Sequence, residues 1–237
     1  MKYEEMRPHQ IEKVLREKPI AYIAWGAHEW HGPHNAIGLD AIKAYNQCLA
    51  LCEKTGGVVL PPVYCGYQTM KPARGFGHTL EFSKTLVRDL LFEHLEQLYD
   101  EGFRVMIVVM GHYGGKHQET IQEAVSLFQE RHHMPRAWAF PDYEPTSEDG
   151  FSGDHAGKNE TSLLLHFRPD LVDMEQLPDQ IERYRIGIGG QGDVREASAE
   201  QGRQMVESLV RNAVPRIEAL LEEANEQYRN RYGESCD

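Results

Sequence analysis

Short apolar runs alternate with amphipathic segments along most of the chain. Apolar runs at residues 19–25, 58–60, 105–110 and 137–140 predict four strands. The run 105–110 contains no polar residue, which is typical of a parallel strand buried on both faces. Apolar positions at helical spacing predict helices over residues 7–17, 40–54, 83–101, 118–132, 159–166 and 197–229, and Pro215 predicts a kink or break in the last of these.

This alternation of strands and helices predicts an α/β domain. Its sheet should be mostly parallel with helices on both faces, because successive parallel strands need crossover connections. The sequence contains no internal repeat, low-complexity segment or linker, so residues 1–237 are expected to form a single domain. Residues 64–77 and 142–156 are predicted loops, and residues 176–192 are a predicted irregular stretch with room for an edge strand.

Composition excludes several function classes. The formal net charge is -12 and no cluster of Lys and Arg exceeds a pair, which argues against binding to nucleic acid or to anionic membranes. The four cysteines, Cys48, Cys52, Cys65 and Cys236, have neither zinc-ribbon nor redox-pair spacing and are expected to be reduced thiols. The N-terminus lacks a signal-peptide pattern and no apolar run approaches the ~18 residues of a membrane span, so a cytoplasmic protein is expected.

Side chains that bind metals follow the predicted strands. Glu29, His31 and Asp40 come after the first strand, and His112 comes directly after the strand 105–110. Because the carboxyl ends of parallel strands share one edge of a sheet, these side chains should converge there. Together with a third carboxylate, these two carboxylates and two imidazoles suffice for two adjacent divalent ions that share one carboxylate.

A third segment, residues 154–160, places His155 and Glu160 at the start of a predicted helix. From the residues alone two alternatives stay open. Both side chains could join the metal site, or Asn159-Glu160 could be the acidic first turn that favours a helix N-terminus.

Two motifs are misleading. Gly187 to Gly192 matches G-x-G-x-x-G, but it has no strong preceding strand and no following βαβ unit, so a flexible loop is the better interpretation. His28-Glu29-Trp30-His31 is not H-E-x-x-H, because its histidines are three apart. The chain also lacks the G-x-S-x-G elbow of an α/β-hydrolase.

Three spaced motifs resemble those of the creatininase (creatinine amidohydrolase) family over nearly the whole chain. The first is a strand followed by G-x-x-E-x-H-G-P-H and a later Asp, here Gly26 to His34 and Asp40. The second is an apolar strand that ends in a His-containing glycine loop, here Met110 to Lys116. The third is H-A-G-x-x-E-T-S, here His155 to Ser162.

The resemblance implies a three-layer α/β/α sandwich with a binuclear Zn²⁺ or Mn²⁺ site, in a homo-oligomer such as a hexamer. Glu29, Asp40 and His112 would hold one ion, and His31, the bridging Asp40 and a further carboxylate the other. In creatininases proper that carboxylate lies two residues after the motif His, where this chain has Gly114. Glu160 is the best substitute, and the departure argues against creatinine itself as the substrate.

These inferences lead to one function hypothesis and two alternatives. The hypothesis is a metal-dependent amidohydrolase that cleaves a C–N bond in a small, preferably cyclic, amide by a metal-activated hydroxide. His155 and Glu160 are the candidate catalytic residues for proton transfer, and Tyr113 and His78 are the candidate substrate-binding residues. The alternatives are a non-enzymatic protein of the same fold with a structural metal, and a metal-dependent hydrolase of another ester class such as phosphoesters.

Overall fold

A five-stranded parallel sheet forms the centre of the computed structural model, which describes residues 1–133 and 136–232. Its strands are β1 (Ile20–Gly26), β2 (Val58–Val59), β3 (Val63–Tyr64), β4 (Val105–Met110) and β5 (Arg136–Pro141). They lie in the order β2-β1-β4-β5, and β3 pairs with the end of β1. Every strand pairing is parallel, which confirms the predicted sheet type.

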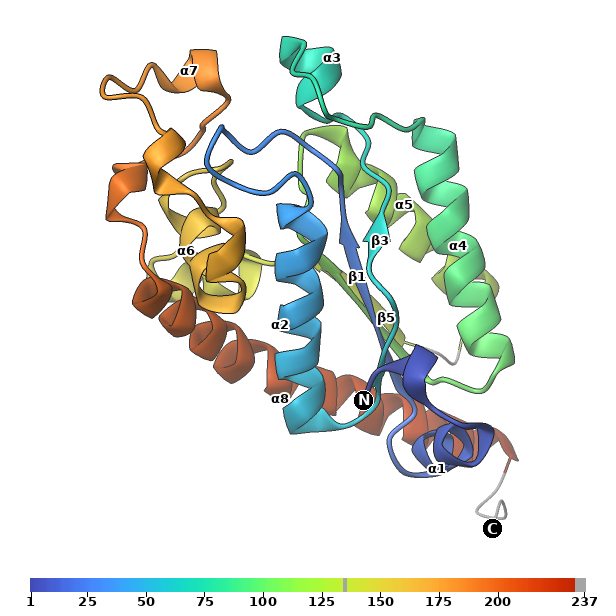
Figure 1. Cartoon of the computed structure of the whole chain (residues 1–237). Helices are drawn as coiled ribbons and strands as arrows, with labels where there is room; N and C mark the ends of the chain where they lie inside the picture. Colours follow the sequence, from blue (N-terminus) through green and yellow to red (C-terminus); the bar gives the residue numbers. More distant parts are fainter. Residues whose placement is uncertain (134–135, 233–237) are drawn as a thin grey trace.

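Helices cover both faces of this sheet (Figure 1). The longer ones are α1 (Pro8–Glu17), α2 (Leu39–Thr55), α4 (Lys84–Asp100), α5 (Lys116–Arg131), α6 (Lys158–Phe167) and α8 (Ala199–Tyr232). Two short helices, α3 (Met70–Arg74) and α7 (Arg183–Ile186), stand beyond the carboxyl ends of the strands. Single 3-10 turns occupy Tyr3–Glu5, Glu144–Asp149, Pro169–Leu171, Met174–Gln176 and Val194–Glu196.

The central strand β1 separates two apolar layers. Alternate residues Ala21, Ile23 and Trp25 pack with α4 and α5, whereas Ile20, Tyr22 and Ala24 pack with α2 and α8. All seven residues of β1 are buried, as expected for a strand between two helical layers. The three-layer α/β/α fold is therefore confirmed.

Three local predictions differ from the structure. The predicted loop 64–77 contains the end of β3 and all of α3, because elements of two and five residues are too short to create a periodic pattern. Residues 176–192 contain α7 and no strand; Gly189 forms just an isolated bridge with His155. Of the kink or break predicted at Pro215, the break is wrong, since α8 continues through it while Ala213 and Ile217 pack into the core on either side.

Other predictions agree with the described residues. Cys48, Cys52 and Cys65 are buried free thiols, and Cys236 lies outside the described residues. The G-x-G-x-x-G segment follows helix α7, with Gly187 as its left-handed cap, and not a strand. Within residues 1–133 and 136–232, no helix combines the length and apolarity that a membrane crossing requires.

Two glycines allow α2 to approach the sheet closely. A Cβ at Gly26 would lie 2.2 Å from the backbone nitrogen of Ala41, and a Cβ at Gly111 would lie 2.0 Å from the carbonyl oxygen of Asp40. The first turn of α2 therefore rests on the ends of β1 and β4. This contact fixes where the Asp40 side chain begins.

We predict that Gly111→Ala destabilises the protein, because the added Cβ overlaps backbone that cannot move without shifting α2. The free energy of unfolding should fall by about 1–3 kcal/mol, measured by urea denaturation. Gly77→Ala is the matched control, since its Cβ would meet no heavy atom within 4 Å, and it should stay within about 0.5 kcal/mol of the original protein. Equal stability of the two variants would contradict the close contact.

Candidate metal centre

Five metal-binding side chains from three separate segments meet beyond the ends of β1 and β4. Glu29 and His31 lie in the loop after β1, Asp40 is in the first turn of α2, His112 follows β4, and Glu160 is in the first turn of α6. Each of them is at most 3 % exposed. The sequence places these residues up to 131 positions apart, and the parallel sheet brings them together at one edge.

Asp40 occupies the middle of the group. Its Oδ1 lies 2.9 Å from Nε2 of His31, and its Oδ2 lies 3.3 Å from Nδ1 of His112. On one side Nδ1 of His112 is also 2.9 Å from Oε2 of Glu29, and on the other Nε2 of His31 is 3.4 Å from Oε2 of Glu160. Two sets of three ligand atoms result, each within 4.8 Å of one another: Glu29, Asp40 and His112, and His31, Asp40 and Glu160.

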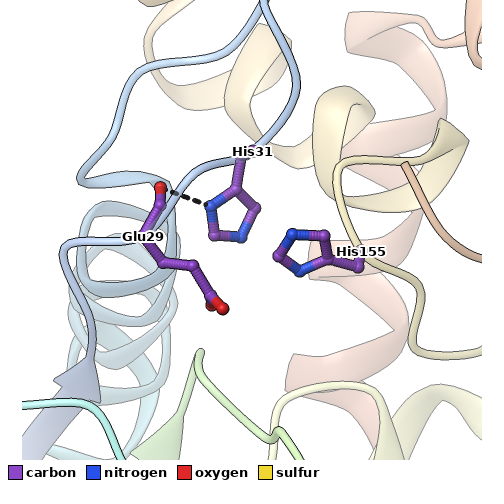
Figure 2. A group of neighbouring side chains, drawn as sticks. All are labelled: Glu29, His31 and His155. Atoms are coloured by element: carbon purple, nitrogen blue, oxygen red, sulfur yellow. Dashed lines mark hydrogen bonds between the residues drawn. The ribbon is translucent and has the colours of Figure 1, made fainter. Parts of the chain in front are cut away.

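Both imidazoles are held by backbone carbonyl groups. Nδ1 of His31 lies 3.0 Å from the carbonyl oxygen of Glu29, as Figure 2 shows, and Nε2 of His112 lies 3.0 Å from that of Tyr67. A carbonyl oxygen can only accept a hydrogen bond, so Nδ1 of His31 and Nε2 of His112 each carry a hydrogen. The other ring nitrogen of each histidine faces Asp40. A histidine that donates its far nitrogen to a carbonyl is the usual arrangement of a metal ligand.

The donor set fits divalent ions. Nε2 of His31 and Oδ2 of Asp40 are buried and have no hydrogen-bond partner among the described residues, although each lies close to an oppositely charged group. The two atoms belong to different ligand sets, because Oδ2 of Asp40 faces His112 and not His31, so an ion in each set would give each atom a partner. Nitrogen and oxygen donors of this kind suit Zn²⁺ and Mn²⁺.

The buried carboxylates and imidazoles of the site shift one another's pKa values. Burial alone would lower the pKa of His31, but the carboxylates of Asp40 and Glu160 outweigh it and raise that pKa to about 10. The pKa of His112 is likewise raised well above its usual value, because Glu29 and Asp40 outweigh its burial. Burial opposes ionisation of Asp40, yet the two imidazoles lower its pKa well below the usual range. Without ions, protons on the histidines thus compensate the buried carboxylates.

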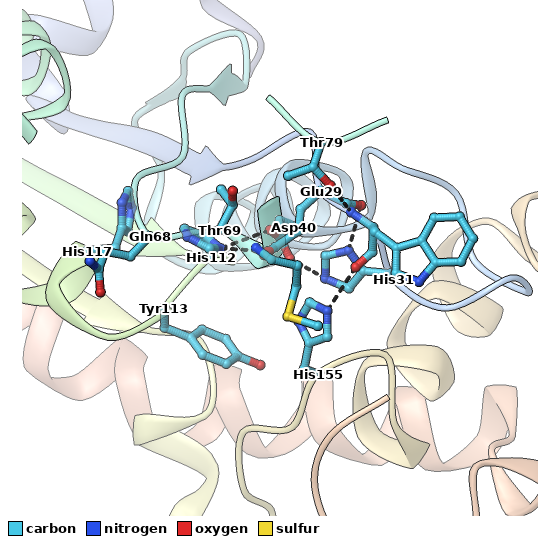
Figure 3. A network of polar contacts seen from close by, with 12 residues as sticks. Glu29, His31, Asp40, Gln68, Thr69, Thr79, His112, Tyr113, His117 and His155 are labelled. Carbon is cyan, nitrogen blue, oxygen red and sulfur yellow. Dashed lines mark hydrogen bonds and ion pairs between the residues drawn. The ribbon is translucent and has the colours of Figure 1, made fainter. Parts of the chain in front are cut away.

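The loop before α3 supports Glu29 and His112. The backbone N–H of Met70 donates to Oε1 of Glu29 at 2.5 Å, and the carbonyl of Tyr67 accepts from His112. Figure 3 shows Glu29 and His112 beside Asp40. Between them Gln68 has a left-handed backbone with φ of 61°. Glu81 stabilises this turn, because its carboxylate accepts the N–H groups of Gln68 and Thr69, each at 2.8 Å.

This loop also explains Gly114. A Cβ at Gly114 would lie 2.7 Å from the carbonyl oxygen of Gln68, so a larger residue would require the loop to shift. The position where creatininases proper carry a glutamate therefore has no space for one here. A carboxylate does face His31 from the other side of the site, that of Glu160.

His155 lies beside His31, with ring centroids 4.3 Å apart. Its Nε2 lies 2.9 Å from the carbonyl oxygen of Trp30 and so carries a hydrogen. Burial, followed by the charge of His31, lowers the pKa of His155, so the ring is neutral and its Nδ1 has a free lone pair. His155 also forms a third group of ligand atoms with Glu29 and His31.

The predicted substrate-binding residues have different positions. The ring of Tyr113 lines the cavity beside the site, while its hydroxyl donates to Oε1 of Glu160 at 2.8 Å. His78 is exposed and is not among the residues that line this cavity, so the structure does not bring it to the site. It belongs to a turn with φ of 56°, next to Thr79, whose hydroxyl accepts the N–H of Trp30.

The two remaining histidines of the loop after β1 order the structure around the site. His34 is buried against the hydroxyl of Thr161 at 3.1 Å, and burial followed by the charge of His31 lowers its pKa to about 4. His28 stacks on Tyr64 with centroids 4.3 Å apart. His34 thus ties the loop to α6, and His28 stays outside the ligand groups.

Several charged groups at the site were not predicted from the sequence. Lys43 is fully buried beside Glu160 and Asp142, and its sequence signal is the i, i+3 spacing from Asp40 that places both on one helix face. Asp154 caps α6 through the N–H groups of residues 159 and 160. Burial and then the charge of Glu160 raise the pKa of Asp154 to about 7. Nδ1 of His117 accepts the N–H of Tyr67. Nothing in the sequence around His117 indicates this role.

Curated relatives have related hydrolytic activities. The chain is 26 % identical over 180 residues to creatinine amidohydrolase of Pseudomonas putida, which covers 68 % of each chain. It is 27 % identical over 228 residues to the mycofactocin precursor peptide peptidase of Mycolicibacterium smegmatis, which covers 87 % of each.

Solved creatininase structures have the same fold. A crystal structure of creatinine amidohydrolase superposes with a TM-score of 0.78 at 22 % identity, over 91 % of this chain and 95 % of the other. Further creatininase structures, with TM-scores of 0.77 at 21 % identity, are a mutant of Zn-Zn type and a form named for Mn. The sequence profile of the creatininase family, described as creatinine amidohydrolase, matches residues 4–217. This match over most of its length shows that the chain belongs to the creatininase family.

Proposed function

We propose that this protein is an amidohydrolase that uses two divalent ions, Zn²⁺ or Mn²⁺, to cleave the C–N bond of a small amide. The observation that carries the proposal is Asp40, a buried carboxylate with one oxygen facing His31 and the other facing His112. Glu29, Asp40 and His112 would hold one ion, and His31, Asp40 and Glu160 the other. The metal-containing creatininase structures support the choice of ions.

Divalent ions in such a site polarise a carbonyl group and lower the pKa of water toward neutrality. Metal binding and proton transfer would fall to different residues of the chain. Glu160 is kept ionised, since Lys43 and His31 outweigh burial and lower its pKa, and it suits the role of ligand better than that of base. His155 is neutral with a free lone pair on Nδ1, so this nitrogen can accept a proton and later return it to the leaving nitrogen.

The cavity beside the ligands suits a small, uncharged or cationic substrate. Its volume is about 540 Å³, within the usual range for small-molecule sites. Tyr113 and Tyr143 offer ring faces, and Gln68, Gln118 and Ser152 offer polar groups. Among the described residues that line it, none is Lys or Arg, and Asp154 adds a carboxylate. This lining disfavours phosphoesters, because it offers no Lys or Arg to bind an anion. The open cavity also disfavours a purely structural metal, because structural metal sites are closed.

Other expectations from the sequence stay predictions. These are the single domain over residues 1–237, the homo-oligomer and the cytoplasmic location. The cyclic nature of the amide is also a prediction. Sedimentation of the metal-loaded protein would give the oligomeric state directly.

Asp40→Ala should remove both ions, because the two ligand sets share this carboxylate. Mass-spectrometric metal analysis should find about two ions per subunit in the original protein and fewer than one in the variant. Asp170→Ala is the matched control, since Asp170 is an exposed carboxylate paired with Arg168 at 2.6 Å. Two ions retained by the Asp40 variant would rule out the bridging role.

The metal-free protein should lose stability in alkali. The pKa of His31 is raised to about 10, above the ~6.5 of an unfolded histidine, so its protonation stabilises the fold fully below pH ~6.5 and that stabilisation is lost as the pH approaches 10. His34 and His155, whose pKa values are lowered, are already neutral in this window and add no pH dependence there.

We therefore expect the melting temperature in a chelator to fall between pH ~7 and ~9.5, whereas saturating Mn²⁺ replaces the protons and removes most of this decline. Differential scanning fluorimetry at matched ionic strength measures both. A flat profile in the chelator would contradict protonated histidines in the metal-free site.

The reaction class can be tested with a substrate panel. Protein loaded with Mn²⁺ or Zn²⁺ should hydrolyse members of a set of lactams, cyclic ureas and formamides and leave aryl phosphates unchanged, because the described residues that line the cavity include no Lys or Arg. His155→Ala should lower kcat by about 10²–10⁴-fold with the metal content retained. Turnover of the phosphates with none of the amides would favour the phosphoesterase alternative.

A further inference from the structure

Lys43 is a buried cation that the proposed reaction does not use. It lies on α2, one turn after Asp40, and its side chain has no solvent exposure. Its Nζ lies 2.7 Å from Oε1 of Glu160 and 3.0 Å from Oδ2 of Asp142. A lysine is seldom buried unless it is paired, so two carboxylates around one ammonium group require an explanation.

The two oxygens of Glu160 have separate partners. Oε1 accepts from Lys43 at 2.7 Å and from the hydroxyl of Tyr113 at 2.8 Å. Oε2 accepts the backbone N–H of Ala156 at 2.8 Å and lies 3.4 Å from Nε2 of His31. Rotation of the carboxylate would break the charged bond at Oε1, so Oε2 stays directed at His31 and Asp40.

Asp142 completes the arrangement by sharing the same ammonium group. It follows β5 and is 3 % exposed. One ammonium group is therefore shared by two carboxylates. When both carboxylates are ionised, the three side chains keep a net negative charge beside the second ligand set.

The ring of Tyr113 limits the movement of Lys43. Nζ of Lys43 lies 4.5 Å from the centroid of this ring and 3.2 Å from its hydroxyl. Tyr113 in turn packs edge-on against Tyr143, with centroids 5.0 Å apart. The lysine is thus held between α2, the loop after β4 and the loop after β5, on the side of Glu160 away from His31.

We propose that Lys43 is a positioning residue that fixes Glu160 with Oε2 directed toward His31 and Asp40, and so completes the ligand set of the second ion. The inference rests on the proposed binuclear function. It concerns the second ion alone, because Glu29 and His112 are held instead by the backbone of residues 67–70.

The test compares Lys43→Met with the double variant Lys43→Met/Asp142→Asn. The single variant leaves both Asp142 and Glu160 buried without their cation and can fail to fold. In the double variant residue 142 is neutral, so only Glu160 loses a cation, and it keeps His31 beside it. Calorimetric titration of metal-free protein with Mn²⁺ alone gives the affinities of the first and second ions. The EPR signal of a spin-coupled Mn²⁺ pair reports whether both sites are filled.

For the double variant we expect a melting temperature in chelator close to that of the original protein. The first ion should bind within about threefold of the original affinity, and the second at least about tenfold more weakly, with loss of the coupled EPR signal. Tyr113→Phe removes the neutral donor to the same oxygen and keeps Lys43, so the second ion should weaken by less than about threefold.

Each other result overturns the proposal. Two ions bound by the double variant with unchanged affinities would mean that Lys43 only neutralises Asp142. Tighter binding of the second ion would mean that Lys43 repels it. A loss in Tyr113→Phe equal to that of the double variant would assign the positioning to Tyr113. If the original protein binds fewer than two ions, the binuclear function itself fails, and this is visible before any variant is measured.

Discussion

The carboxylate of Asp40, buried between two imidazoles, is the interaction on which the site depends. It begins on α2, whose first turn lies against the ends of β1 and β4 through the glycines at 26 and 111. A side chain at either glycine would push the helix away from the sheet. The position of the shared carboxylate is therefore set by backbone packing in the core, not by a mobile loop.

Burial of several carboxylates in one place needs compensating charge. Asp40 and Glu160 both lie in the first turns of helices, where the helix dipole favours negative charge. Histidine protons supply further positive charge in the metal-free protein, and divalent ions would replace them. Lys43 supplies a further positive charge that does not depend on bound metal. This charge lies next to Glu160 and Asp142.

The two ligand sets are supported by different parts of the fold. Glu29 and His112 are held by the backbone of residues 67–70, which Glu81 stabilises from outside. Glu160 is held by Lys43, by Tyr113 and by the cap of α6. The loop that supports the first set also fills the space next to Gly114, and the carboxylate that faces His31 comes from α6.

The sequence by itself determined the sheet, most helices and the residues of the candidate site. Apolar runs and helical spacing report burial, and burial on both faces at 20–26 and 105–110 is a local property of the chain. The ligand residues follow those runs, so their convergence follows from the rule for parallel strands. The family motifs then favoured Glu160 as a ligand over an ordinary acidic helix start.

Only the tertiary structure decided how those residues are held. The pairing of Lys43 with Asp142 and Glu160, the exclusion of a side chain at Gly114 and the tautomer of His155 involve contacts between residues 40 or more positions apart. No local pattern records such contacts. The short elements β3 and α3 and the exposed position of His78 were likewise unpredictable, because loop conformation depends on the surface against which the loop packs.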